Sequence, residues 1–250
     1  MTDTTMLFDG ATAPLGQTVR IGLILLSTDE ICADAFTSIL PRDDVLVFQT
    51  RAAYDEKGAG DDLAAPMTDI VNTLPPPGRF DILAFGCTSA TVAMGIDGLV
   101  RQLSEARPGL RYTSPAIGAV EALRHLEAQR VALLTPYSLA FHRKMIVFFE
   151  ENGFEIMADG AFPKQTDSEV AELTPEAIFE AARALVDRKQ PDALFISCGA
   201  TPVTPLIEEL EQELGIAVIG SVQAMAWHAL RLAGYSRSIS GYGRLMRIAR

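Results

Sequence analysis

Two of the three cysteines in this 250-residue sequence stand at the ends of similar apolar runs. The first run is Asp81-Ile-Leu-Ala-Phe-Gly-Cys87, and the second is Asp192-Ala-Leu-Phe-Ile-Ser-Cys198. Each run predicts a strand that is buried on both faces and ends with its cysteine at the carboxyl edge of a sheet, where open α/β sheets bind ligands. A helical pattern follows each cysteine, and a thiolate is favoured among the N–H groups of a helix N-terminus. We therefore expect two activated thiols.

Two thiols that face one substrate carbon from opposite sides suit two kinds of reaction. One thiolate takes a proton from the carbon or adds to it, while the opposed thiol delivers a proton to the other face. This geometry serves racemisation, and also cis–trans isomerisation by addition and elimination. The small residues after each cysteine offer hydroxyl and backbone N–H donors to an anion. The candidate catalytic residues are Cys87 and Cys198, and the first candidate substrate-binding residues are Thr88, Ser89, Gly199 and Ala200.

The elements that position the two cysteines occur twice along the chain. Residues 130–137 resemble residues 20–27, and Ile219-Gly-Ser-Val-Gln-Ala224 is similar to Ile117-Gly-Ala-Val-Glu-Ala122. Together with the cysteine runs, these matches in one order indicate an internal duplication. We predict an α/β fold of two similar Rossmann-like parallel-sheet domains, related by a pseudo-twofold axis, with the active site in the cleft between them.

The repeat also predicts where the domains begin and end. Residues 18–128 form the first half with Cys87, and its last helix packs on the other half; residues 129–234 form the second half with Cys198. We expect a flexible N-terminal tail over residues 1–17 and a C-terminal extension at the surface over residues 235–250. Apolar periodicity and Pro/Gly stops predict strands at 19–26, 45–48 and 154–157, and helices at 61–74, 90–105, 222–232 and from 175 onward.

Composition and charge restrict the partners. A net charge of −11 argues against a nucleic-acid surface and against binding to anionic lipid. The sequence has no apolar stretch of about 18 residues and no basic segment typical of a secretory signal, so we expect a cytoplasmic protein with reduced thiols. Neither metal-ligand spacing nor a nucleotide fingerprint is present, so no metal or cofactor is expected. The expected partner is a small-molecule carboxylate substrate, and a homo-oligomer is compatible with the sequence.

Three motifs resemble those of the aspartate/glutamate racemase superfamily: Gly86-Cys87-Thr-Ser-Ala, Thr135-Pro-Tyr137 and Ser197-Cys198-Gly-Ala200. From Val19 onward the chain is similar to the branch that includes maleate cis–trans isomerase and arylmalonate decarboxylase, and it also looks like the ectoine-utilisation proteins of that branch. The decarboxylases lack the first cysteine, so the resemblance implies a cofactor-independent isomerase or racemase. It further implies that Cys87 is the nucleophile or base, that Cys198 is the proton donor and that Tyr137 orients a substrate carboxylate.

The sequence departs from the maleate isomerases at two positions. Those enzymes carry an asparagine after the first strand and another in the second half, where this chain has Asp29 and Asp167. A carboxylate close to a second carboxylate is repelled by on the order of 1–4 kcal/mol. An Asp can instead bind an ammonium group or accept a hydrogen bond from an amide. We therefore expect a substrate with a basic or amide group facing Asp29, and Ser27 completes the candidate substrate-binding set.

Several residues also have a purely structural interpretation. Asp29 can cap the helix that follows the first strand, and Ser168 can start a short helix after Asp167. Cys32 falls on an apolar helix face and is expected in the core. The three histidines lie in predicted helices away from the strand ends and are expected to have structural or surface roles; they are His125, His142 and His228.

Two other functions stay open on the sequence. The first is an arylmalonate-type decarboxylase, in which Cys198 alone protonates an enediolate. The second is a non-catalytic, two-lobed small-molecule binding protein, which would need neither cysteine.

Overall fold

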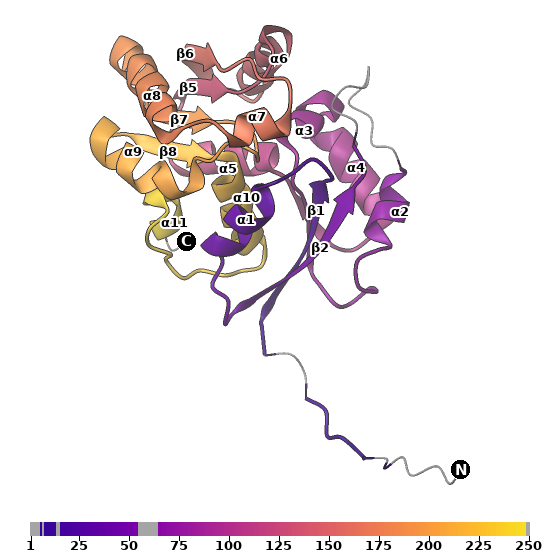
Figure 1. Cartoon of the computed structure of the whole chain (residues 1–250). Helices are drawn as coiled ribbons and strands as arrows, with labels where there is room; N and C mark the ends of the chain where they lie inside the picture. The colour runs from indigo at the N-terminus through magenta and orange to yellow at the C-terminus, as the bar shows by residue number, and fades with distance from the viewer. Residues whose placement is uncertain (1–5, 7, 14–15, 55–64, 249–250) are drawn as a thin grey trace.

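The computed structural model describes residues 6, 8–13, 16–54 and 65–248 (Figure 1). Its core is two four-stranded parallel sheets with the same strand order, β2-β1-β3-β4 and β6-β5-β7-β8. The first sheet consists of β1 (Val19–Leu26), β2 (Val45–Ala52), β3 (Ile82–Phe85) and β4 (Arg111–Thr113). The second consists of β5 (Arg130–Thr135), β6 (Glu155–Ala161), β7 (Ala193–Ile196) and β8 (Ala217–Gly220). The predicted fold class is confirmed.

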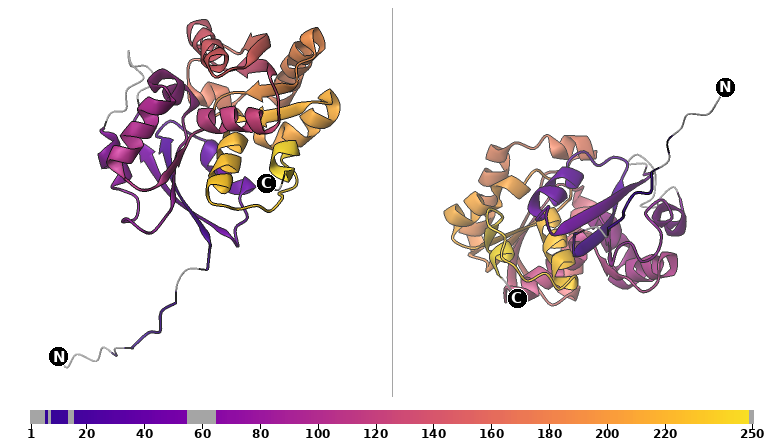
Figure 2. Two further views of the ribbon diagram at one scale, coloured as in Figure 1. Left: turned by 180° about the vertical axis from the view of Figure 1, so that it is seen from behind. Right: turned by 90° about the horizontal axis from the view of Figure 1, so that it is seen from below.

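Helices cover both sheets (Figure 2). The helices of the first half are α1 (Cys32–Ile39), α2 (Met67–Val71), α3 (Thr88–Met94), α4 (Ile96–Ala106) and α5 (Pro115–His125). Those of the second half are α6 (Leu139–Glu151), α7 (Asp167–Ala171), α8 (Pro175–Lys189), α9 (Ile207–Leu214), α10 (Ser221–Leu232) and α11 (Gly243–Arg247). Within the described residues, no helix is both long enough and apolar enough to cross a membrane.

The two halves are joined by an exchange of equivalent helices. α10 of the second half contacts β3 and β4 of the first, α5 of the first half contacts β8 of the second, and α5 and α10 pack against each other. Their approach is close because Gly118 in α5 lies directly against the backbone of Ala224 in α10. One hydrophobic core therefore runs through both sheets.

The edge strands are longer than predicted. β2 and β6 lie at the edges of their sheets and continue to Ala52 and Ala161, past the predicted ends at Phe48 and Met157. Their second halves alternate or mix polar and small residues, which an edge strand tolerates because one side is not covered by another strand. The predicted helix at 90–105 is instead two helices, interrupted at Gly95 with φ +73°. Of the predicted helix at 61–74, residues 61–64 lie outside the described residues, and α2 occupies only Met67–Val71.

The prediction of a surface C-terminal extension is wrong for its last part. Leu245 and Met246 are buried in α11, which packs against α9 and β8. The buried Glu211 carboxylate accepts hydrogen bonds from the N–H groups of Val218 (3.0 Å) and Arg244 (2.7 Å). The buried Glu211 thus binds the C-terminal segment, although the basic composition of that segment had suggested that it is exposed.

Candidate active site

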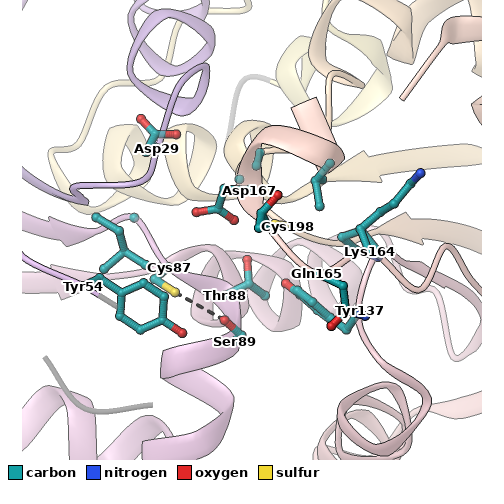
Figure 3. Close-up of a pocket in the computed structure, with 17 residues that line it drawn as sticks. Asp29, Tyr54, Cys87, Thr88, Ser89, Tyr137, Lys164, Gln165, Asp167 and Cys198 are labelled. Atoms are coloured by element: carbon teal, nitrogen blue, oxygen red, sulfur yellow. Dashed lines mark hydrogen bonds between the residues drawn. The ribbon is translucent and has the colours of Figure 1, made fainter. Parts of the chain in front are cut away.

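A cavity of about 140 Å³ lies where the carboxyl ends of the two sheets face each other. Clefts for drug-sized ligands measure about 300–1,000 Å³, so this cavity suits a small substrate. Nine of the ten predicted site residues line it: Asp29, Cys87, Thr88, Ser89, Tyr137, Asp167, Cys198, Gly199 and Ala200. Figure 3 shows that both cysteines belong to this one space, although they come from different sheets.

Cys87 is separated from β3 by Gly86 alone and is the N-cap residue of α3. Its sulfur accepts a hydrogen bond from the Ala90 N–H at 3.4 Å and lies 3.4 Å from the Ser89 hydroxyl oxygen. Burial raises the pKa of the Cys87 thiol, and these hydrogen bonds lower it only in part. The predicted helix N-terminus is present, but its N–H groups offset the desolvation of the thiol only in part.

Cys198 sits in a different local structure. It follows β7 with φ +81°, a backbone conformation that side-chain-bearing residues rarely adopt. A turn separates it from a 3₁₀ helix at Thr204–Leu206, so Cys198 does not begin a helix as the sequence had suggested. Burial raises the pKa of the Cys198 thiol above its ordinary value, and the Asp167 carboxylate raises it further. Both effects disfavour a thiolate at Cys198.

Tyr137 and Thr88 are fixed by hydrogen bonds across the site. The Ser197 hydroxyl donates to the Tyr137 oxygen at 3.2 Å, and the Tyr137 hydroxyl donates to the Cys198 sulfur. The Thr88 hydroxyl lies 3.1 Å from that of Ser221, at the start of α10. Thr88 thus joins the two halves, while Tyr137 presents its ring to the cavity beside Cys198.

The two aspartates lie on the same side of the cavity. Asp29 accepts hydrogen bonds from the N–H groups of Cys32 (2.8 Å) and Ala33 (3.3 Å), so it caps α1 as well as lining the cavity. The Thr28 hydroxyl donates to Asp167 at 2.6 Å. Figure 3 places Asp167 between Asp29 and the cysteines. Burial raises the pKa of both carboxyl groups, and the charge of Asp29 raises that of Asp167 further.

Ser27 does not line the cavity, and its side chain instead holds a residue that does. The Ser27 hydroxyl accepts a hydrogen bond from the Tyr54 N–H at 3.1 Å, and the Tyr54 ring faces the cavity near Cys87 (Figure 3). Tyr54 was not predicted. It follows β2, whose last four residues were missed, so a longer strand would have placed it at the same sheet edge as Cys87.

The loop after β6 supplies three further cavity residues that the sequence did not single out. Lys164, Gln165 and Thr166 line the cavity beside Asp167. The Lys164 ammonium group is turned away from the cysteines in Figure 3. The Thr166 hydroxyl caps α7 by accepting from the Glu169 N–H at 3.2 Å, so this short helix holds Asp167 at its first position.

Comparison with known proteins gives the same family by sequence and by structure. The sequence model described as arylmalonate decarboxylase matches residues 95–246. Maleate isomerase of Nocardia farcinica is 34% identical over 175 residues, which cover 67% of this chain and 69% of that protein. Arylmalonate decarboxylase of Bordetella bronchiseptica is 31% identical over 146 residues, which cover 55% of this chain and 58% of that protein.

A solved structure resembles the whole fold. A mutant of the Nocardia farcinica maleate cis–trans isomerase, with a covalently bound succinylcysteine intermediate, matches with a TM-score of 0.81 and 28% identity. The match covers 92% of this chain and 98% of that one. The chain therefore belongs to the arylmalonate decarboxylase family, and its similarity to the maleate isomerases identifies it as an isomerase of that family.

Proposed function

We propose that this protein isomerises a small unsaturated carboxylate by covalent addition of Cys87 and protonation by Cys198. The observation that supports this assignment is that the two sulfurs share one cavity but differ in their surroundings. Both sulfurs have hydrogen-bond donors, but the Asp167 charge ranks next after burial in raising the pKa of Cys198 and counts for less at Cys87, so the pKa of Cys198 is raised further. The sulfur that ionises more readily is the nucleophile, and the other is the acid.

The reaction balances with these two groups alone. After Cys87 has lost its proton to solvent, its sulfur adds to one carbon of a cis double bond, and Cys198 gives its proton to the other carbon. The new C–C single bond rotates. The Cys198 thiolate then takes a proton back from the same carbon while the C–S bond breaks, which releases the trans product and restores the Cys87 thiolate. A relative carries such a succinylcysteine, which supports the covalent route.

The charges in the cavity support a substrate with a single carboxylate. Asp29 and Asp167 both line it, and the described lining residues include one cationic side chain, Lys164, which is turned away. A second substrate carboxylate would face two carboxyl groups and be repelled. An amide or ammonium group could instead donate to them. We therefore propose a cis-unsaturated monocarboxylate with an amide or ammonium group, bound through its carboxylate by Tyr137 and the donors next to the two cysteines.

Proton NMR in D₂O with maleate, its monoamide, arylmalonate and α-amino acids tests the proposal. We expect cis–trans conversion of the monoamide with a higher kcat/KM than for maleate. Cys87→Ser and Cys198→Ser should each lower kcat on the order of 10³-fold or more. In Cys198→Ser, mass spectrometry should find an adduct on Cys87 equal to the full mass of the substrate, because addition loses no atom.

The other outcomes are equally informative. Faster turnover of maleate than of the monoamide would reject the proposed substrate class but keep the two-thiol mechanism. Loss of carbon dioxide that survives in Cys87→Ser would instead indicate a decarboxylase. Binding without any conversion would indicate a binding protein.

A further inference from the structure

The third cysteine lies directly beneath the two cysteine loops. Cys32 is 1% exposed and is the first residue of α1. A Cβ atom added to Gly199 would lie 3.2 Å from the Cys32 sulfur, and one added to Gly86 would lie 3.8 Å from it. Cys32 therefore occupies the space that a side chain would take at the residue following Cys198, and it lies next to the residue that precedes Cys87.

The two glycines also meet each other. A Cβ atom on Gly199 would lie 3.4 Å from the Gly86 carbonyl oxygen and 3.4 Å from the Cys32 Cβ. Gly86 is anchored because its N–H donates to the Ile24 carbonyl at 2.7 Å. The φ angle of Gly199 lies outside the left-handed region. A glycine is needed there for space, because a methyl group would meet Cys32 on one side and Gly86 on the other.

We propose that Cys32, wedged against Gly86 and Gly199, sets the separation of the Cys87 and Cys198 sulfurs and is a positioning residue for the reaction. Each glycine is covalently next to one of the two cysteines, so a displacement at this contact passes to both thiols. A misplacement of about 1 Å can cost on the order of 100-fold in rate. The inference rests on the proposed two-thiol function. It assigns the role to the size of the Cys32 side chain, not to its thiol chemistry.

The test is a double-mutant cycle of Gly199→Ala and Cys32→Ala, with Cys32→Ser as the conservative variant. Alanine at 199 keeps the backbone N–H, but its Cβ would lie 3.2 Å from the Cys32 sulfur, so one of the two must shift by a few tenths of an ångström. We expect kcat to fall on the order of 10-fold while KM stays within about twofold. Cys32→Ala removes this sulfur, so the double variant should recover most of this loss. Cys32→Ser should keep kcat close to that of the wild type.

Crystal structures of the four cycle members give a readout that needs no substrate. The separation of the Cys87 and Cys198 sulfurs should change in Gly199→Ala and return in the double variant. If Gly199→Ala keeps the wild-type kcat, or if the double variant is no better than Gly199→Ala, the inference is wrong. If Gly199→Ala does not fold, Cys32→Val enlarges the side chain on the other side of the same contact. An unchanged kcat in that variant would overturn the inference.

Failure of the proposed function gives a different pattern. In that case the wild type converts none of the compounds or Cys87→Ser remains active, while the sulfur separation in the crystal structures still decides whether Cys32 is a spacer.

Discussion

The two site cysteines occupy different environments although they follow equivalent strands. Cys87 caps a helix, whereas Cys198 lies in a turn with a left-handed backbone conformation, where the Asp167 carboxylate ranks next after burial in raising its pKa. Burial raises the pKa of both thiols. The hydrogen bonds at the helix N-terminus offset only part of the effect of burial on Cys87, and the pKa of Cys198 is raised further than that of Cys87.

The raised pKa of Cys87 predicts how its reactivity depends on pH. A thiol reacts as its thiolate, so the alkylation rate rises about tenfold per pH unit below its pKa and then levels off. A free cysteine levels off near pH ~8.5. We expect the rate for Cys87, followed by iodoacetamide labelling and mass spectrometry, to keep rising above that pH, with Cys198 slower throughout. Glutathione in the same samples is the control, and a plateau for Cys87 below pH 8 would contradict the prediction.

At the scale of elements, the buried strands could be predicted from sequence and the edge strands only in part. β1, β3, β5 and β7 are continuous apolar runs, and both cysteines could be placed at the sheet edge from those runs alone. β2 and β6 end in mixed residues that resemble loop composition. For that reason Tyr54 and the residues 164–166, which follow these edge strands, were missed as cavity residues.

Contacts between elements could not be predicted from the sequence either. Cys32 was correctly expected in the core, but nothing in its helix indicates that it lies next to Gly86 and Gly199. The same holds for Ser27, whose position at a strand end suggested substrate binding, whereas its hydroxyl holds Tyr54. Such roles depend on which segments meet in space, and local patterns do not encode that.

The close packing of α5 on α10 requires a residue without a side chain at position 118. A Cβ atom there would lie 2.5 Å from the Ala224 carbonyl oxygen, so the two helices would have to separate. Gly→Ala in a helix normally stabilises by up to about 1 kcal/mol, whereas overpacking costs about 1–3 kcal/mol. We expect overpacking to dominate in Gly118→Ala and to lower the midpoint of urea unfolding.

A matched control is available in α4. A Cβ atom on Gly98 would meet only the Met94 Cβ, at 3.7 Å. Gly98→Ala should therefore leave the midpoint unchanged or raise it. Equal effects of the two substitutions would show that helix propensity, not the contact between α5 and α10, determines the result.

At the scale of the whole molecule, the two halves also meet at the cavity through hydrogen bonds between side chains. The loop after β1 reaches α7, where Thr28 donates to Asp167 at 2.6 Å and the Ser168 hydroxyl donates to Glu30. These bonds connect segments that are 139 and 138 residues apart in sequence. They hold the first and second halves together on the side of the cavity that carries the aspartates.

Removing one of these bonds should loosen both segments together. A hydrogen bond of this kind contributes about 0.5–1.5 kcal/mol. We expect Ser168→Ala to raise KM by about 2–10-fold and to speed amide hydrogen exchange in residues 27–31 and 166–171 alike. Arg183→Ala, which removes a surface ion pair with Glu213 away from the cavity, is the control. Faster exchange in one segment only would argue against a shared connection.

The left-handed backbone conformation at Cys198 is unfavourable for stability, although Cys198 is the proposed proton donor. Any residue with a Cβ atom is disfavoured at φ +81°, and glycine would relieve a strain of about 1–3 kcal/mol. For folding stability alone, glycine would therefore be the favoured residue at position 198. The backbone conformation at position 198 does not itself favour a cysteine. A thiol at this position therefore carries a conformational cost that glycine would avoid, which the proposed role of Cys198 as the proton donor would account for.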